Sequence, residues 1–269
     1  MAQPRTYSTN AIILKRFPYG EADRILTLFT PYKGKISAIA KGTRRPVSRK
    51  SGHLELLCLS RLHVAQGRNL DIITQAQVSE SFLHLRGEFW HMTCSTYLAE
   101  LIDRLIEDDN PYPEVYELLT LALRVLDADA QELQQQRTAG TLNAAHERDR
   151  SLLLLRFFEI HLLSLIGYEP LLRTCAHCDA ELEPVENGFT PTLGGALCPE
   201  CSHLWSHKIS VNALKVLRLL QRSSWAQVPR LHLNEQLHGE IEHAVRGLLR
   251  QHLERDPESW EFLAMSTRH

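Results

Sequence analysis

The sequence predicts an α+β protein in two parts, a small five-stranded β-barrel followed by an α-helical domain with an inserted four-cysteine ribbon. Three observations support this prediction. Residues 7–80 alternate short β-prone segments with Gly- and Pro-containing turns. After residue 80 the apolar residues recur at spacings of three and four, which is the helical period. Two C-x-x-C pairs then interrupt the helical part.

The first part contains five segments with strand character and no long helix between them. Turn-like residues separate them at Phe17-Pro18-Tyr19-Gly20 and Pro31-Tyr32-Lys33-Gly34. Five strands without crossover helices favour a closed barrel over a parallel sheet, and the oligonucleotide/oligosaccharide-binding (OB) barrel has this strand count. We therefore predict an OB domain over residues 1–80. Its strands are Ala11–Arg16, Arg24–Thr30, Gly34–Lys41, His53–Val64 and Leu70–Glu80.

The second part, residues 81–269, is predicted to be helical, with the ribbon inserted at 172–206. One apolar helical face runs from Leu98 to Ile106, and Asn110-Pro111-Tyr112-Pro113 ends that helix. Residues 127–151 lose the period and are interpreted as a helix extension plus a mobile linker. The other predicted helices are Val115–Leu126, a buried helix over 152–166 that ends at Gly167, Val211–Leu220 and Leu237–Leu253.

Composition places the chain among ordinary globular proteins, with 43% hydrophobic and 23% charged residues in 269. The first ten residues have no apolar core and do not resemble a signal peptide. The most apolar run, Leu152–Ile166, is shorter than a membrane span and contains charged residues. We expect a cytoplasmic protein.

The charge is divided unevenly along the chain. Residues 1–80 contain 13 Lys+Arg and 5 Asp+Glu, a balance of +8. The whole chain has 30 Lys+Arg and 32 Asp+Glu. The residues after 80 therefore have 17 Lys+Arg and 27 Asp+Glu, a balance of −10. A solvated surface accounts for scattered charge, but so uneven a division favours contact between the N-terminal part and nucleic acid or another acidic partner.

Four of the six cysteines form the strongest local motif. Cys175-Ala-His-Cys178 and Cys198-Pro-Glu-Cys201 are separated by nineteen residues, a spacing typical of structural zinc, because each tight turn directs two thiolates at one ion. We predict one structural zinc ion per chain and no open position for catalytic water. Cys58 and Cys94 lie in apolar surroundings and are expected to be small buried hydrophobes.

Other features of this segment refine the interpretation. A redox dithiol would explain one C-x-x-C pair but not the second. Asn187-Gly188 predicts a hairpin turn, and Gly194-Gly195 lets the chain bend back before Cys198. The nearby histidines are expected at the surface rather than as ligands; they are His177, His203 and His207.

A basic segment, residues 41–50, lies between two predicted strands. It has five cations and no acid, with Gly42 and Pro46 keeping it a loop. Arginine forks and lysine charges can neutralise phosphates, although a solvated charge run is the alternative. Tyr19, in a turn, is a candidate for stacking on bases; Phe17, Phe29 and Tyr32 are expected in the core. The predicted nucleic-acid-binding residues are Tyr19, Lys33, Lys35, Lys41, Arg44, Arg45, Arg49 and Lys50.

Motifs for several enzyme classes are missing from the sequence. It contains no G-x-x-x-x-G-K-[ST], no dinucleotide fingerprint and no H-E-x-x-H, so nothing indicates nucleotide hydrolysis or metalloprotease chemistry. No catalytic residue is predicted, and we expect a protein that is not an enzyme.

In their order along the chain, these motifs resemble the RecO family of bacterial recombination mediators. The resemblance rests on Gly20-Glu21-Ala22-Asp23-Arg24, Lys33-Gly34-Lys35 and the 40–45 segment, then on the two C-x-x-C pairs, Gly194-Gly195 and Ile209-Ser210. It implies a protein that binds single- and double-stranded DNA and anneals complementary strands without ATP. With RecR, such a protein helps load RecA onto single strands coated by the single-stranded DNA-binding protein.

The resemblance also implies a contact with the acidic C-terminal tail of the single-stranded DNA-binding protein. Apolar helix faces with interspersed arginines could supply it, and the candidates are Arg104, Arg124, Arg156, Arg218 and Arg222. Two other functions stay open: a zinc-ribbon accessory factor in transcription or translation, and a zinc-dependent nucleic-acid-modifying enzyme with Glu200 as acid or base.

Overall fold

The computed structural model describes residues 6–45, 48, 50–140 and 144–266. It divides into two compact units, residues 1–134 with 257–269, and residues 135–256. Helix α3 (Pro113–Ala139) contributes residues to both. Among the described residues, no helix is both long and apolar enough to cross a bilayer.

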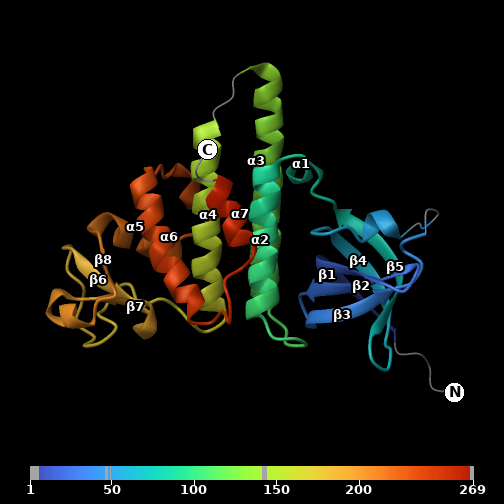
Figure 1. Ribbon diagram of the computed structural model, residues 1–269, viewed down its shortest axis with the longest axis horizontal. Coiled ribbons are helices and arrows are strands. Elements are labelled where there is room, and N and C mark those ends of the chain that lie inside the picture. Colours follow the sequence, from blue (N-terminus) through green and yellow to red (C-terminus); the bar gives the residue numbers. More distant parts are fainter. Residues whose placement is uncertain (1–5, 46–47, 49, 141–143, 267–269) are drawn as a thin grey trace. The chain divides into compact units, whose positions relative to one another are not determined.

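Five strands close into a barrel in the order β1-β2-β3-β5-β4 (Figure 1). They are β1 (Thr6–Tyr19), β2 (Asp23–Thr30), β3 (Gly34–Ala40), β4 (Leu59–Ala65) and β5 (Asp71–Glu80). All neighbours are antiparallel except β3 and β5, whose parallel pairing closes the barrel. The interior is filled by aliphatic side chains such as Leu26, Leu28, Leu62 and Ile73. The predicted five-stranded barrel is confirmed.

β1 is longer than the predicted Ala11–Arg16. Its first half pairs with β4 and its second half with β2, and the register shifts between Ile13 and Lys15. A bulge of this kind bends a strand, which lets one strand serve two neighbours in a closed sheet. The predicted turn at residues 17–20 is therefore wrong, because the strand continues through Pro18 to Tyr19. The turn begins at Gly20, which has a φ of +55°.

The predicted strand His53–Val64 is also too long. Ser51–His53 form a 3₁₀ turn (η1), and β4 begins only at Leu59. Between them Leu57 adopts a φ of +64°, which a strand cannot contain. Leu54 and Leu57 are nevertheless fully buried. The apolar pattern of this segment thus reflects burial of a turn against the barrel rather than strand pairing.

In its described residues, the first unit also contains four α-helical segments, of which α2 (Phe89–Leu105) and α3 contact the barrel strands. The four are α1 (Leu83–Arg86), α2, the first part of α3, and α7 (Ser259–Ser266). Leu85 amide and His84 amide both donate to Asp127 Oδ1 of α3, at 3.0 and 2.9 Å. Glu100 of α2 accepts from the Ser259 amide at the start of α7, at 3.0 Å. Side-chain and backbone polar contacts thus fix the helices to one another.

The second unit is a helical layer with a small sheet. Its helices are the last part of α3, α4 (Ala144–Leu165), α5 (Val211–Arg222) and α6 (Glu235–Arg250), with the 3₁₀ segment η4 (Trp225–Arg230). The sheet has the order β7-β6-β8, formed by β7 (Gly195–Leu197), β6 (Asn187–Thr190) and β8 (His207–Ile209). Short 3₁₀ segments η2 (Pro191–Leu193) and η3 (Pro199–Leu204) connect the strands.

The predicted helices at 152–166, 211–220 and 237–253 correspond to α4, α5 and α6, although α4 ends at Leu165 and α6 already at Arg250. The linker prediction for 127–151 is only partly right. The helix extension is confirmed, since α3 runs to Ala139, but α4 begins as early as Ala144. Gln and Ala are good helix formers even without an apolar stripe, so loss of period did not end the helix there.

Candidate nucleic-acid interface and metal centre

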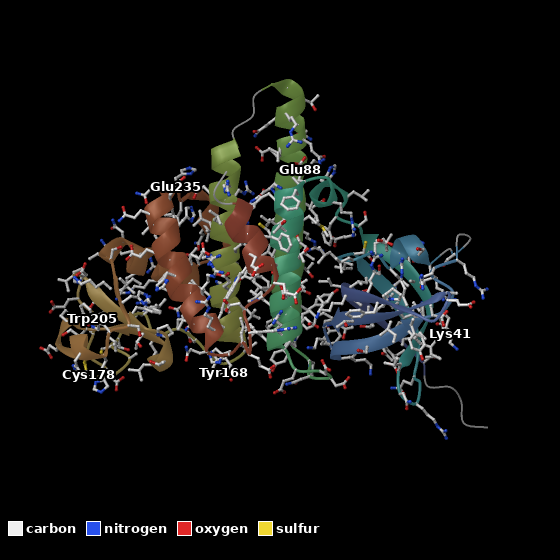
Figure 2. The ribbon with its side chains drawn as sticks, viewed as in Figure 1. Lys41, Glu88, Tyr168, Cys178, Trp205 and Glu235 are labelled. Atoms are coloured by element: carbon white, nitrogen blue, oxygen red, sulfur yellow. The ribbon has the colours of Figure 1, made fainter. Side chains whose placement is uncertain are left out.

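The loop end of the barrel, defined here as Phe17, Tyr19 and the described residues of 41–45, gathers part of the predicted DNA-binding set. The Arg44 amide donates to the Ala22 carbonyl at 2.9 Å, and its guanidinium donates to the Gly20 carbonyl at 3.0 Å. The start of the basic loop therefore lies against the β1–β2 turn. Figure 2 labels Lys41 at this end of the barrel.

Local contacts hold the loop in a defined conformation. Gly42 has a φ of +70°, and its amide donates to Asp23 Oδ1 at 2.8 Å. The buried Thr43 hydroxyl donates to the Ala40 carbonyl at 3.0 Å. These contacts fix the backbone of the loop to β2 and β3, and the side chains of Lys41, Arg44 and Arg45 remain exposed. A preorganised loop loses less entropy when it binds a ligand.

Two exposed aromatic rings lie on β1, just before the turn at Gly20 that Arg44 contacts. Tyr19 is 53% exposed and Phe17 is 52% exposed, and their spacing of two on β1 puts them on one face of the strand. The expectation that Phe17 and Tyr32 lie in the core is wrong: Tyr32 is 80% exposed, whereas Phe29 is buried as expected. Phe17 was missed because it was assigned to a turn, while strand alternation would have paired it with Tyr19.

The remaining predicted residues do not join this group. Lys33 lies at the opposite end of β3, with its Nζ 4.3 Å from the centre of the Tyr7 ring. Lys35 is 13% exposed, and its Nζ is 3.1 Å from Asp108 and 2.5 Å from the Asp103 carbonyl. Lys50 Nζ donates to the Ile73 carbonyl at 3.3 Å. Arg49 lies outside the described residues.

The metal centre is formed by four cysteine thiols brought together from two turns. The Sγ atoms of Cys175, Cys178, Cys198 and Cys201 all lie within 4.8 Å of one another. The Cys178 and Cys198 sulfurs are 3.7 Å apart. Four sulfurs at about 2.3 Å from a tetrahedral zinc ion are separated by about 3.8 Å, so the four-thiol group fits such an ion. Figure 2 labels Cys178 in this segment.

Backbone geometry explains why the thiols converge. In the first turn, the Cys175 amide donates to the Ala180 carbonyl and the Asp179 amide to the Cys175 carbonyl, at 2.8 and 3.0 Å. In the second, the Cys201 amide donates to the Cys198 carbonyl at 3.1 Å. Burial raises the pKa of Cys175, but the backbone donors at Cys178, Cys198 and His177 outweigh it and lower that pKa to about 6. The pKa of Cys201, by contrast, is raised to about 12, first by burial and then by the neighbouring thiols.

Gly188 serves close packing rather than the predicted turn. Asn187 and Gly188 lie buried inside β6, so the hairpin predicted there is wrong. A Cβ at Gly188 would be 2.0 Å from the Trp205 ring, and Trp205 donates from its indole to the Cys198 carbonyl at 3.2 Å. The chain turns at Gly194 instead, with a φ of +76°, as the Gly194-Gly195 pattern predicted.

The histidines near the cysteines differ from one another. His177 and His203 are exposed, as expected. His207 is half-buried rather than fully exposed: it lies between Phe189 and His243, with ring centres 5.4 and 4.5 Å away, and lines a hollow of the second unit. Cys58 and Cys94 are both buried, which confirms that prediction.

Comparison with known proteins matches both halves of the chain. The family model described as Recombination protein O N terminal matches residues 1–82, and Recombination protein O C terminal matches 86–139 and 136–261. The chain belongs to the RecO family. Its barrel and its cysteine-bearing helical region are thus those of a family of DNA repair proteins.

Curated relatives cover nearly the full length. A DNA repair protein RecO of Dehalococcoides mccartyi is 36% identical over 96% of this chain and 95% of its own. The corresponding protein of Roseiflexus sp. is 38% identical over 96% of this chain and 85% of its own. The RecO protein of Pelotomaculum thermopropionicum is 32% identical over 96% of this chain and 94% of its own. The resemblance to the RecO family is therefore confirmed along the whole chain.

Proposed function

We propose that this chain is a non-enzymatic mediator of DNA repair and recombination that binds single- and double-stranded DNA through the loop end of its barrel. The observation that carries the proposal is the juxtaposition of exposed Lys41, Arg44 and Arg45 with exposed Tyr19 and Phe17. Cations neutralise phosphates and aromatic faces stack on bases, which together give sequence-independent binding. The β1–β2 loop is also one of the loops that OB barrels use.

Membership in the RecO family supports the rest of the proposal. The bound strands are annealed without ATP, and with RecR the protein helps load RecA onto strands coated by the single-stranded DNA-binding protein. The helical region receives the acidic tail of that coating protein. These activities place the protein in the cytoplasm, associated with the nucleoid.

Of the arginines considered for the tail, several are already engaged. Arg104 is bound to Glu100 and Arg124 to Glu80, while Arg156 lies buried beside Glu159. Arg222 is exposed on α5. A fluorescent peptide with the acidic tail, titrated against the full chain, should bind saturably at low salt. Failure to saturate would remove the tail from the proposal without affecting DNA binding.

We propose further that the four thiols hold one structural zinc ion. Four protein ligands fill a tetrahedral site, so no position is left for a water nucleophile. Such an ion stabilises the fold of the ribbon rather than supplying chemistry. This donor set argues against the alternative of a zinc-dependent modifying enzyme.

The salt dependence of DNA binding tests the barrel interface. In Lys41→Ala/Arg45→Ala, two phosphate contacts are removed, while Arg44 keeps its bond to the Gly20 carbonyl. The slope of log affinity against log salt should fall by about 1.4 for single strands, at about 0.7 per contact. Arg61→Ala/Lys208→Ala removes two exposed cations elsewhere and serves as the control. Equal slopes for both variants would place the DNA away from the loop end.

A further inference from the structure

The second unit carries a groove of about 740 Å³ between the ribbon and α5. Its α5 wall presents Lys215, Arg218 and Arg222, and its ribbon wall presents Arg173. The two acids in its lining are Asp179 and Glu181. Four cations and two acids give the groove a local balance of +2.

The cations follow one line along the helix. Positions 215, 218 and 222 are spaced by three and four, so they share one face of α5. Seven residues of helix extend over about 10 Å. That length equals about three nucleotide steps of a B-form strand at 3.4 Å each. Cations in a row fit a row of phosphates better than they fit one terminal carboxylate.

Three of the four cations have no ion-pair partner among the described residues. Within the described residues, no carboxylate oxygen forms an ion pair with Arg173, Lys215 or Arg222, and all three are exposed. Burial lowers the pKa of Arg218 and the positive charge of Arg173 lowers it further, while the negative charge of Glu181 raises it; the net direction is downward. Like charges thus gather at the groove at an electrostatic cost, which an anionic ligand would offset.

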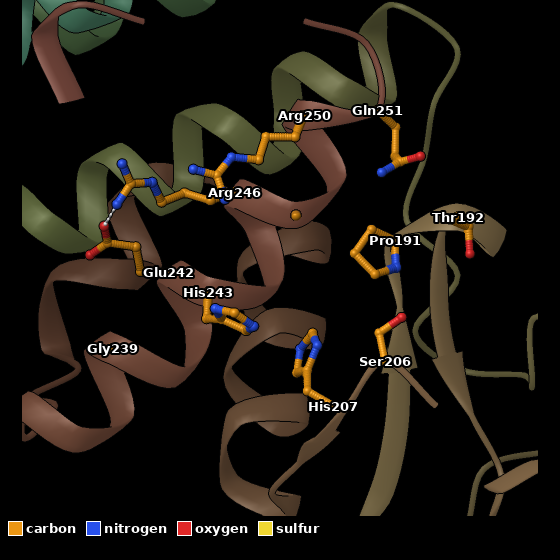
Figure 3. A pocket seen from close by; sticks show the side chains of 11 residues that line it. Pro191, Thr192, Ser206, His207, Gly239, Glu242, His243, Arg246, Arg250 and Gln251 are labelled. Carbon is orange, nitrogen blue, oxygen red and sulfur yellow. Dashed lines mark hydrogen bonds and ion pairs between the residues drawn. The ribbon is translucent and has the colours of Figure 1, made fainter. Parts of the chain in front are cut away.

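A second hollow in the same unit provides a contrast (Figure 3). It measures about 470 Å³ and includes Arg246 and Arg250. Arg246 is 2.9 Å from Glu242, and Arg250 is 2.5 Å from Asp256. Because intramolecular acids already hold both arginines, that hollow offers less positive charge to a ligand than the groove on α5.

The charge of this unit permits nucleic-acid binding. The balance of −10 outside residues 1–80 is concentrated in 81–134, which has 3 Lys+Arg and 11 Asp+Glu, a balance of −8. Residues 135–256 have 13 Lys+Arg and 14 Asp+Glu, a balance of only −1. Acidity of the helical region as a whole is therefore no obstacle to a polyanion at the groove.

We propose that this groove, lined by Arg173, Lys215, Arg218 and Arg222, binds the sugar–phosphate backbone of a nucleic-acid strand. The chain then has two phosphate-binding surfaces, one in each unit, and the second rests on the proposed DNA-binding function. The apolar side chains of its lining are Leu182 and Leu219, and no aromatic ring lines it, so the groove binds charge without stacking on bases.

Charge reversal on α5 tests this inference. Lys215→Glu/Arg222→Glu changes two exposed side chains and spares Arg218, whose Nε donates to the Leu172 carbonyl at 2.6 Å. Lys208→Glu/Arg255→Glu makes the same change in net charge outside the groove and is the control. The milder Lys215→Ala/Arg222→Ala applies if the reversal affects folding, which thermal unfolding reports.

Binding of the full-length proteins to fluorescent single-stranded DNA gives the readout. The alanine variant should lower the salt slope by about 1.4, and the reversal should weaken binding at least tenfold more than its control does. If groove and control variants bind DNA alike, the inference is overturned. Loss of binding to an acidic peptide with normal DNA binding would also overturn it and assign the groove to a protein partner. If the wild-type chain binds no DNA, the proposed function itself fails.

Discussion

At the scale of single residues, the four cysteines allow the clearest prediction, which concerns metal content. Each supplies one of four sulfurs within 4.8 Å, so removing any of them leaves an incomplete site. Cys198→Ser should lower the zinc content from one ion per chain and destabilise the ribbon by several kcal/mol, since binding of a structural zinc ion contributes to folding. Metal analysis and thermal unfolding measure both effects.

The Cys198→Ser variant also tests whether the metal site is structural or takes part in DNA binding. DNA binding by the barrel should survive in Cys198→Ser at temperatures where the first unit stays folded. Cys58→Ser, a change at a buried cysteine outside the group, is the control and should keep the full zinc content. A wild-type chain purified without chelator that contains no zinc would contradict the assignment.

Gly188 is the second residue with a sharp prediction. An added Cβ would lie 2.0 Å from the Trp205 ring, and the ring is held by its bond to the Cys198 carbonyl. Gly188→Ala should therefore destabilise the second unit by about 1–3 kcal/mol, the usual range for overpacking. Chemical denaturation measures the change. Gly239→Ala, where nothing lies within 4 Å of the added Cβ, should not destabilise α6; an equal loss at both positions would contradict the packing argument.

At the scale of elements, the sequence predicted the five strands, the main helices and the cysteine group. These predictions rest on local sequence patterns: alternation of apolar residues in strands, recurrence of apolar residues every three or four positions in helices, and the two C-x-x-C pairs. Strand ends failed where apolar residues were buried in a non-repetitive turn, as at Leu54 and Leu57. The Asn187-Gly188 pattern failed because a distant ring, Trp205, requires the glycine.

The site was predictable only in part, for the same reason. The cations of the 41–50 loop were visible in the sequence, but the engagement of Lys35 by Asp103 and Asp108 depends on tertiary packing. The groove on α5 was predicted only in part, since Arg218 and Arg222 were candidates for binding an acidic tail but Lys215 and Arg173 were not. Its signal, a cation at 215, 218 and 222, was present, but Arg173 joins it only through the fold.

The attachment of α7 to α2 gives a pH prediction. Glu100 accepts from the Ser259 hydroxyl and amide and from the Glu258 amide, at 2.6, 3.0 and 2.9 Å. Burial raises its pKa, but these donors and Arg104 outweigh burial and lower the pKa below the usual value of 4.5. The carboxylate therefore stabilises the fold above about pH 4.5, and this stability is lost as the pH falls through the lowered pKa.

Glu100→Gln should remove about 2 kcal/mol of stability at pH 7, the scale of hydrogen bonds to a charged acceptor. The difference from wild type should shrink as the pH falls below 4.5. Denaturant unfolding at several pH values measures it. Glu107→Gln, at an exposed acid just after α2, is the control. If the difference in unfolding free energy between wild type and Glu100→Gln does not change with pH, ionisation of Glu100 does not stabilise the attachment of α7.

At the scale of the whole molecule, the net charge differs between the segments of the chain. The barrel segment has a balance of +8, residues 81–134 one of −8, and residues 135–256 one of −1. Part of the barrel charge is used internally, since Lys15 and Lys35 contact Asp103 of α2. The exposed cations at the loop end and on α5 are among those available to a polyanion.

Two phosphate-binding surfaces in one chain suit a protein that brings strands together. Each would screen the repulsion between backbones, and neither would read bases, so any complementary pair could anneal. No bond is made or broken in this process. On this proposal, annealing requires neither a nucleotide nor a catalytic residue.

The rate at which complementary oligonucleotides anneal, measured without ATP, tests this account most directly. The wild-type chain should accelerate annealing, and the acceleration should persist on strands coated by the single-stranded DNA-binding protein. Combining Lys41→Ala/Arg45→Ala with Lys215→Ala/Arg222→Ala should slow annealing more than either pair alone. No acceleration by the wild-type chain, or acceleration that requires ATP, would contradict the proposal of a non-enzymatic DNA-annealing mediator.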